Sequence, residues 1–154
     1  MEPRIVSKPG FTVVGVKYRG KNENQEIPEV WGEFGSRFSD FKHRSEEGIA
    51  YGAMDNYDPD IGEFDYVAGV AISSSKGQPA DLTVWDIPGA TYAVFTTTLP
   101  AIRSAFDSIY HDWLPASDYQ RQSGPEFELY DERFDPQDPE SELDIYIPVE
   151  RKQE

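Results

Sequence analysis

The chain has 154 residues, with 14 lysines and arginines against 29 aspartates and glutamates, which gives a formal net charge of −15. Nucleic-acid phosphates and anionic membrane surfaces both attract basic proteins, so this charge argues against direct binding to either. The absence of cysteine excludes disulfides, thiolate nucleophiles and cysteine-ligated zinc. The aromatic content of 14% argues against disorder, and the length suits one domain.

Neither a membrane span nor a signal peptide is expected. The chain has no run of about 18 apolar residues, the length that a spanning helix needs. The N-terminal residues lack the apolar core of a signal peptide. We therefore expect a soluble cytoplasmic protein, and its charge favours a cationic small molecule or a basic protein surface as partner.

The first half of the chain predicts a strand, a helix and two further strands, after a short arm that ends at Pro9-Gly10. The strands are predicted from β-branched and aromatic residues, and the helix from aromatic residues spaced by three and four positions. The expected strands are residues 11–18, 48–54 and 64–72. The residues that predict the helix are Trp31, Phe34, Phe38 and Phe41.

The second half repeats this order after a polar loop over residues 73–79. Residues 82–88 and 90–98 are expected to form a strand pair around Gly89, and later strands are expected from residue 125 and over 143–149. Pro100 and Pro115 bracket the predicted second helix. The apolar stripe of this helix consists of Leu99, Ile102, Phe106, Ile109 and Trp113.

Two spacings support an internal repeat. Residues 48–54 lie 76 positions before 124–130, and residues 64–70 lie 79 positions before 143–149. We therefore predict an α+β fold: a duplicated βαββ module with pseudo-two-fold symmetry, antiparallel sheets and one long helix in each half. The whole chain, 1–154, forms one domain in this prediction, with pseudo-repeats at about 11–72 and 82–150. A groove between the halves is a natural ligand site.

Alternation along the last two long strands predicts their faces. Phe127 and Leu129 should share an apolar face beneath a helix, as should the apolar residues of 143–149. If these two strands pair as a hairpin, their opposite faces present four polar or aromatic side chains together. These side chains are Glu128, Tyr130, Asp144 and Tyr146.

The repeat offers an internal control for Glu128. Gly52 occupies its place in the first half, so the architecture does not require a carboxylate there, and Met54 occupies the place of Tyr130. One interpretation is a solvent-facing surface that simply alternates polar and apolar residues. The other is a carboxylate flanked by aromatic rings, a constellation that recognises cations. Burial beside rings would also raise the pKa of Glu128 and suit it to acid–base chemistry.

Five segments together resemble the GyrI-like small-molecule-binding domain, which also serves as the effector-binding module of some bacterial multidrug-sensing transcription regulators. They cover nearly the whole chain, and their order makes the resemblance specific. The segments are IPEVWGEF (27–34), VWDIPGATYAVF (84–95), AIRSAFDSIYHDWLPASDYQ (101–120), GPEFELYDERFDP (124–136) and ELDIYIPVE (142–150).

The resemblance implies a ligand pocket between the two halves, with a glutamate near its centre and aromatic walls. Glu128 matches that glutamate, Tyr146 and Trp31 match aromatic wall positions, and Asp144 stands at a position that is often acidic. Trp85 is either a pocket wall or a core residue. Tyr92 is a further candidate to line the groove, and Met54 is included as the first-half counterpart of Tyr130.

Three functions remain open from the sequence. The leading one is a stand-alone receptor for an aromatic, lipophilic compound, cationic or neutral, with no cofactor. The first alternative is a hydrolase of electrophilic, cyclopropane-bearing compounds, in which Glu128 activates water or protonates the opening ring and Tyr146 orients the substrate. The second is an acidic protein that modulates DNA gyrase. No metal site is expected, because the only histidines, His43 and His111, are far apart in sequence.

Overall fold

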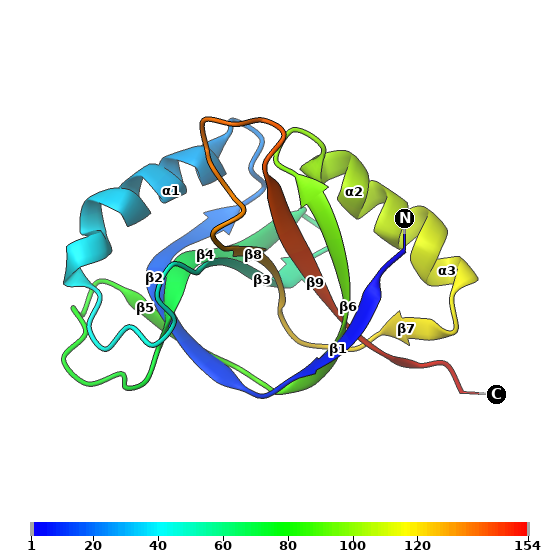
Figure 1. Ribbon diagram of the computed structural model, residues 1–154, viewed down its shortest axis with the longest axis horizontal. Helices are drawn as coiled ribbons and strands as arrows, with labels where there is room; N and C mark the ends of the chain where they lie inside the picture. Colours follow the sequence, from blue (N-terminus) through cyan, green and yellow to red (C-terminus); the bar gives the residue numbers. More distant parts are fainter. Residues whose placement is uncertain (1, 154) are drawn as a thin grey trace.

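The computed structural model describes residues 2–153, which form one antiparallel sheet of nine strands with the helices on one side (Figure 1). The strands run in the order β1-β6-β9-β8-β3-β4-β2-β5, and β7 pairs with β9 outside this path. The fold is therefore the predicted α+β architecture. The strands are β1 (Arg4–Lys8), β2 (Phe11–Gly20), β3 (Ala50–Asp58), β4 (Glu63–Ile72), β5 (Thr83–Ile87), β6 (Ala90–Thr98), β7 (Tyr119–Arg121), β8 (Glu126–Tyr130) and β9 (Glu142–Arg151).

Each half contributes one helical segment, and both segments were predicted. Helix α1 (Glu26–Arg37) leads into a short 3-10 turn at Phe38–Asp40. In the second half α2 (Ile102–Ser108) continues through a π-helical turn (Ile109–Trp113) into α3 (Leu114–Ala116). No helix among residues 2–153 is long and apolar enough to cross a membrane.

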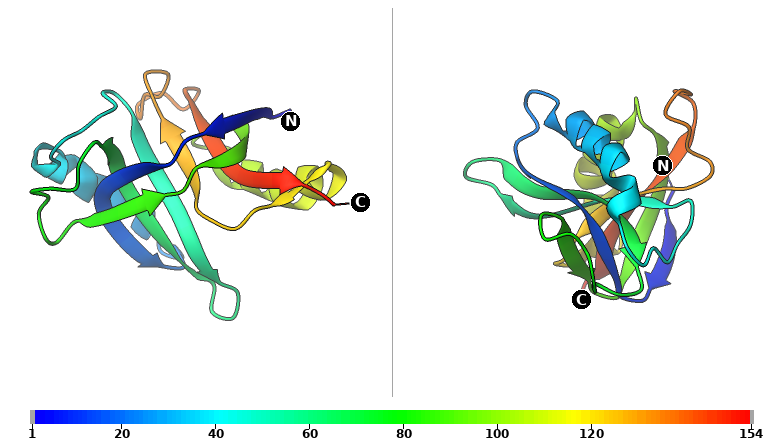
Figure 2. Two further views of the ribbon diagram at one scale, coloured as in Figure 1. Left: turned by 90° about the horizontal axis from the view of Figure 1, so that it is seen from below. Right: turned by 90° about the vertical axis from the view of Figure 1, so that its left-hand side faces the viewer.

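The two halves meet at the pairing of β3 with β8, in the middle of the sheet. Helix α1 packs over the first half and α2 over the second, so β3 and β8 lie in the region of the sheet between the two helices (Figures 1 and 2). The first helix fully buries only Val30, whereas the second buries Ala105 and Ile109 against β6 and β9. The half that ends with β9 therefore holds its helix more firmly.

The halves also exchange their first strands, which differs from the predicted strand pair around Gly89. β5 pairs with β2, and β6 pairs with β1 and β9, so β5 and β6 do not form a hairpin. Pro9-Gly10 and Pro88-Gly89 carry the chain across at the same point, where a Cβ added to Gly10 would stand 3.2 Å from the backbone nitrogen of Gly89. The chain is extended through each Pro-Gly pair instead of reversing, which the sequence pattern did not distinguish.

The two exchanged pairings follow the same register. Val6 pairs with Tyr92 on one edge and Trp85 pairs with Val13 on the other, and each residue lies 79 positions from its counterpart. This is the spacing by which residues 64–70 precede 143–149. The pairing of β1 with β6 and that of β5 with β2 therefore follow the predicted pseudo-two-fold symmetry.

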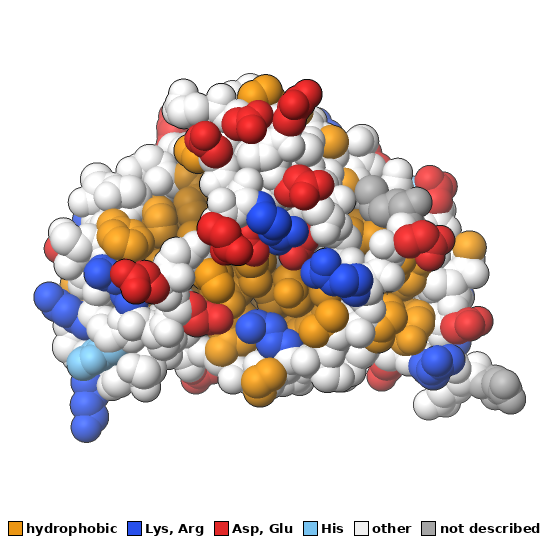
Figure 3. Space-filling view, in the orientation of Figure 1, with side chains coloured by type: hydrophobic (Ala, Val, Ile, Leu, Met, Phe, Trp, Pro, Cys, Tyr) orange, Lys and Arg blue, Asp and Glu red, His pale blue; other side chains and the backbone are white. Residues whose placement is uncertain are grey.

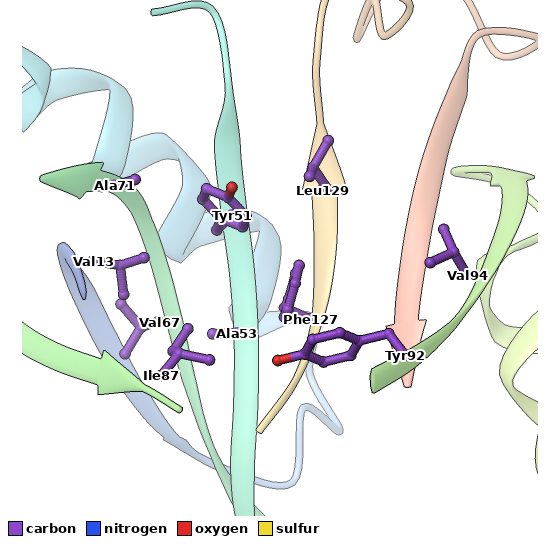
Figure 4. Close-up of a cluster of buried hydrophobic side chains, with 10 residues drawn as sticks. All are labelled: Val13, Tyr51, Ala53, Val67, Ala71, Ile87, Tyr92, Val94, Phe127 and Leu129. Carbon is purple, nitrogen blue, oxygen red and sulfur yellow. The ribbon is translucent and has the colours of Figure 1, made fainter. Parts of the chain in front are cut away.

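The face of the sheet away from the helices carries its own apolar core, which we call the underside core (Figure 4). Tyr51, Tyr92 and Phe127 point toward one another there, and the ring of Phe127 stacks on Tyr146 with centroids 4.6 Å apart. The prediction that Phe127 and Leu129 lie beneath a helix is therefore wrong. The buried members of this core are Val13, Tyr51, Ala53, Val67, Ala71, Ile87, Tyr92, Val94, Phe127 and Leu129.

Candidate functional site

Three alternate cross-strand pairs of β3 and β8 lie on the helix side of the sheet, in the region between α1 and α2, and we call them the floor. From one end to the other the pairs are Ala50 with Tyr130, Gly52 with Glu128, and Met54 with Glu126. Side chains on one face of a strand alternate with those of the other face, so these six residues all point toward the helices. Glu128 lies at the middle of the floor.

Glu128 is buried, with 6% of its surface exposed, and its hydrogen bonds come from tyrosines. Its Oε1 accepts a hydrogen bond from the Tyr66 hydroxyl at 2.7 Å and another from the Tyr130 hydroxyl at 2.9 Å. The indole nitrogen of Trp31 in turn donates to the Tyr66 hydroxyl at 2.8 Å. We call Trp31, Tyr66, Glu128 and Tyr130 the Glu128 cluster.

The second carboxylate oxygen of Glu128 is free to bind another group. Oε2 accepts no hydrogen bond from residues 2–153, yet every fully buried side-chain nitrogen or oxygen in this range has a partner. Oε2 therefore retains some exposure to solvent. No lysine or arginine within these residues forms an ion pair with Glu128.

Gly52 allows the Glu128 cluster to close over the sheet. A Cβ at position 52 would lie 2.2 Å from the Tyr66 hydroxyl and 2.5 Å from Oε1 of Glu128, both well inside van der Waals contact. The glycine opposite Glu128 therefore has a specific structural role. It supplies the space in which the hydroxyl and the carboxylate meet.

Burial controls the protonation of Glu128. Removal from water raises the pKa of Glu128 to about 7, against the lowering effect of the hydrogen bonds from Tyr66 and Tyr130. Burial also raises the pKa of both tyrosines, so their hydroxyls keep their protons and act as donors. Near neutral pH the carboxylate is divided between a neutral and a negative form, and a nearby cation would favour the negative form.

Two cavities lie at the two ends of the floor: Tyr130 of the Glu128 cluster lines the first, and Met54 and Glu126 line the second. The first, which we call the phenylalanine cavity, has a volume of about 680 Å³ and lies at the Tyr130 end beneath the end of α1. Its apolar wall is largely aromatic, made by Phe34, Phe38, Phe41, Tyr130 and Phe134. Acidic side chains gather over the loop between β8 and β9 that borders this end (Figure 3).

The second, which we call the Arg121 cavity, has a volume of about 710 Å³ and lies at the Met54 end. Its apolar wall includes Met54 and Phe64, and its polar wall includes Tyr110, Arg121 and Glu126. Trp31 contacts Tyr130 edge to face, with ring centroids 5.2 Å apart, on the side of the phenylalanine cavity. Glu128 itself lines neither cavity, but it lies on the floor between them.

The structure divides the eight predicted site residues between the two faces of the sheet. Glu128, Tyr130, Trp31 and Met54 lie together on the helix side. The remaining four belong to the underside or its edge, so the prediction that Asp144 and Tyr146 share a face with Glu128 and Tyr130 is wrong. These four are Trp85, Tyr92, Asp144 and Tyr146.

The reason is the register between β8 and β9. Tyr146 pairs with Phe127 and Asp144 pairs with Leu129, so both face away from Glu128. A shift of one residue moves every side chain of a strand to the other face, and alternation alone does not set the register. The eleven-residue loop between the two strands, 131–141, does not determine the register either.

Asp144 has a different environment from Glu128. Its carboxylate accepts hydrogen bonds from Arg133 at 2.8 Å, Arg4 at 3.3 Å and Thr96 at 2.7 Å, and it is 4% exposed. Two arginines and a hydroxyl already occupy it. Asp144 therefore ties β1 and the loop before β9 to the underside.

Sequence analysis did not identify Tyr66, Tyr110 or Arg121 as site residues. Tyr66 lies on β4, next to β3, the strand that contains Gly52. Only the register between β3 and β4 places Tyr66 beside Glu128, and the sequence does not fix that register. Arg121 comes from the short strand β7, which no pattern indicated. His43 and His111 are both exposed, and no metal-binding group of three acidic or histidine residues lies within 2–153.

A duplicated α+β sheet with a buried carboxylate between two helices and two cavities defines a GyrI-like domain. The family model described as "Integron-associated effector binding protein", Cass2, matches residues 4–149, and the chain belongs to this family. It is 36% identical over 152 residues to the transcriptional regulator BrlR of Pseudomonas aeruginosa. The match covers 97% of the chain but 56% of that relative, so the chain spans little more than half of the regulator's length.

Solved structures share the fold at lower identity. SAV2435, determined with bound tetraphenylphosphonium, aligns with a TM-score of 0.73 at 21% identity over 97% of this chain and 94% of its own. The integron cassette protein VCH_CASS2 of Vibrio cholerae aligns at 0.65 with 20% identity, over 97% and 96% of the two chains. EcmrR in complex with DNA aligns at 0.73 with 13% identity over 98% of this chain and 58% of EcmrR.

Proposed function

We propose that this protein is a receptor for a lipophilic aromatic cation, which binds above Glu128 between α1 and α2. The observation that carries the proposal is the carboxylate itself. Glu128 is buried, is held by two tyrosine hydroxyls through Oε1, has a free Oε2 and has no cationic partner among the described residues. A buried carboxylate without a partner costs stability, and a bound cation removes that cost.

The surroundings of Glu128 favour aromatic or apolar groups on the ligand. Trp31 and Tyr130 contact each other edge to face within the Glu128 cluster, and the faces of aromatic rings attract cations through their quadrupoles. The phenylalanine cavity and the Arg121 cavity provide apolar wall on either side. Tetraphenylphosphonium, the ligand of SAV2435, combines one positive charge with four phenyl groups and is therefore a suitable probe.

Calorimetric titration with tetraphenylphosphonium tests the proposal. We expect wild type to bind it and Glu128→Gln to bind about a hundredfold more weakly, since the substitution keeps the shape and removes the charge. Triphenylphosphine oxide, which is neutral, serves as the matched probe and should bind the two proteins equally. Equal affinity of both proteins for the cation would contradict the proposal.

Hydrolysis is a second candidate, favoured by one observation. A carboxyl with a pKa of about 7 beside two tyrosine hydroxyls is suited to proton transfer near neutral pH. Tyr146, predicted to orient the substrate, lies on the opposite face from Glu128, so Tyr66 or Tyr130 would have to do this. Consumption of a cyclopropane-bearing electrophile by wild type, lost in Glu128→Gln, would establish the enzyme.

A further inference from the structure

The helix-side face of β8 carries two carboxylates, of which one is already neutralised. Glu126 and Glu128 are two positions apart on the strand and face the same way, which places them roughly 6.7 Å apart along it. The guanidinium of Arg121 forms an ion pair with Glu126, with 3.2 Å between Nη2 and Oε1. Glu128 has no such partner in the part of the chain that the structure describes.

Arg121 is held firmly in this position. Its Nε donates to the Tyr110 hydroxyl at 3.1 Å, and that hydroxyl donates to Oε1 of Glu126 at 2.5 Å. The guanidinium also donates to the backbone carbonyls of Gln122 and Gly124. Gly124 has φ +126°, a conformation that suits glycine, and this lets the turn wrap around the guanidinium.

These contacts place a resident cation in the Arg121 cavity beside Glu126, which is two residues from Glu128 on β8. Arg121 and Glu126 are both mostly buried, with 28% and 16% of their side chains exposed. Asp55 also lines this cavity, but it follows Met54 on β3 and so alternates to the other face. The helix-side face of β8 therefore offers an incoming ligand one carboxylate without a cationic partner, Glu128, and one ion pair, Arg121 with Glu126.

We propose that Arg121 sets the charge selectivity of the site, so that the receptor accepts singly charged organic cations and rejects dications of the same size. This inference rests on the proposed function. A second positive charge placed near Glu126 would meet the Arg121 guanidinium and gain nothing from a carboxylate that is already paired. Selectivity thus comes from a repulsive group as well as from the attraction of Glu128.

A matched pair of ligands tests the inference. 1-Methyl-4-phenylpyridinium carries one charge, and 1,1′-dimethyl-4,4′-bipyridinium has nearly the same shape but a charge at each end. We expect wild type to bind the monocation more tightly. Arg121→Met frees Glu126 and should raise the dication-to-monocation ratio of affinities by about tenfold or more.

Arg121→Lys is the matched control. Lysine keeps the charge and loses the fork of hydrogen bonds, so it should retain selectivity for the monocation. If the role of Arg121 were only structural, Arg121→Lys and Arg121→Met would change the dication-to-monocation ratio of affinities equally. An unchanged ratio in folded Arg121→Met, or a ratio raised equally in both variants, would overturn the inference.

Titration with tetraphenylphosphonium covers the case in which Arg121→Met does not fold. Glu126→Gln leaves the Arg121 charge without its partner and should lower the affinity by about tenfold. Affinity equal to that of wild type would show that Arg121 does not act on the ligand, while the proposed function would stand. Failure of wild type to bind tetraphenylphosphonium would instead overturn the proposed function and this inference together.

Discussion

Asp144 and Glu128 are both buried carboxylates on neighbouring strands, yet they lie on opposite faces of the sheet and have different partners. Asp144 accepts hydrogen bonds from two arginines and a threonine. Glu128 accepts two from tyrosines and has one oxygen left over. The charge of Asp144 is neutralised by residues of the chain itself. The charge of Glu128 remains available to a ligand, at a cost in stability.

This difference indicates which of the two buried carboxylates belongs to a binding site. A buried charge that the chain itself pairs stabilises the link between elements, and its loss weakens that link. A buried charge that is hydrogen-bonded but not neutralised stores free energy that a ligand can recover. The contrast between Glu128 and Asp144 therefore predicts opposite signs for matched substitutions.

The largest expected effect is a pH-dependent gain in stability in Glu128→Gln. Because burial raises the pKa of Glu128 from 4.5 to about 7, the native state holds the proton more tightly than the unfolded chain does. This part of the stability is complete below pH 4.5 and is lost as the pH rises toward 7. The free energy of unfolding of Glu128→Gln, measured in urea, should rise relative to wild type by about 2–3 kcal/mol between pH 5 and pH 8. A constant difference across that range would contradict the account.

Asp144→Asn should show a loss instead. Removing the charge that Arg4 and Arg133 share should lower the free energy of unfolding by about 2 kcal/mol at pH 7. Its affinity for tetraphenylphosphonium should stay within about twofold of wild type, because the carboxylate faces away from the site. A loss of affinity comparable to that of Glu128→Gln would remove the distinction between the two faces.

Gly52→Ala should lower both the free energy of unfolding and the affinity for the cation, each by a smaller amount. The added methyl group displaces the Tyr66 hydroxyl or the Glu128 carboxylate, since it would stand 2.2 and 2.5 Å from them. We expect a loss of about 1–2 kcal/mol in stability and a fall in cation affinity of about tenfold. Gly35→Ala is a suitable control, because its methyl group would meet no atom within 4 Å. Equal effects of the two substitutions would show that the close approach at Gly52 is unimportant.

The sequence predicted the fold class and both helices, and it singled out Glu128, which the structure buries at the middle of the floor. These followed from apolar periodicity, from the internal repeat and from the motif that resembles the family. Glu128 was singled out because the repeat has Gly52 in its place. What the pattern could not show is that the two residues are cross-strand partners, and that Gly52 gives Tyr66 its access to the carboxylate.

The remaining site residues depended on register, which alternation does not supply. Tyr146 and Asp144 were assigned to the face of Glu128 on the assumption that β8 and β9 align as a hairpin. The observed pairing of Tyr146 with Phe127 reverses that assignment. Tyr92 was expected in the groove, and Trp85 was left open between a pocket wall and the core. The strand exchange at Gly10 and Gly89 brings both to the underside core.

The most direct test of Glu128 as the counter-charge is to count the protons that leave when the cation binds. Tetraphenylphosphonium should be titrated into wild type at pH 6 in buffers of different ionisation enthalpy. With a pKa of about 7, Glu128 is mostly protonated at this pH, so binding should release up to about 0.9 proton. Release should fall toward zero at pH 8 and be absent in Glu128→Gln. Binding heats at pH 6 that do not depend on the buffer would contradict the central claim.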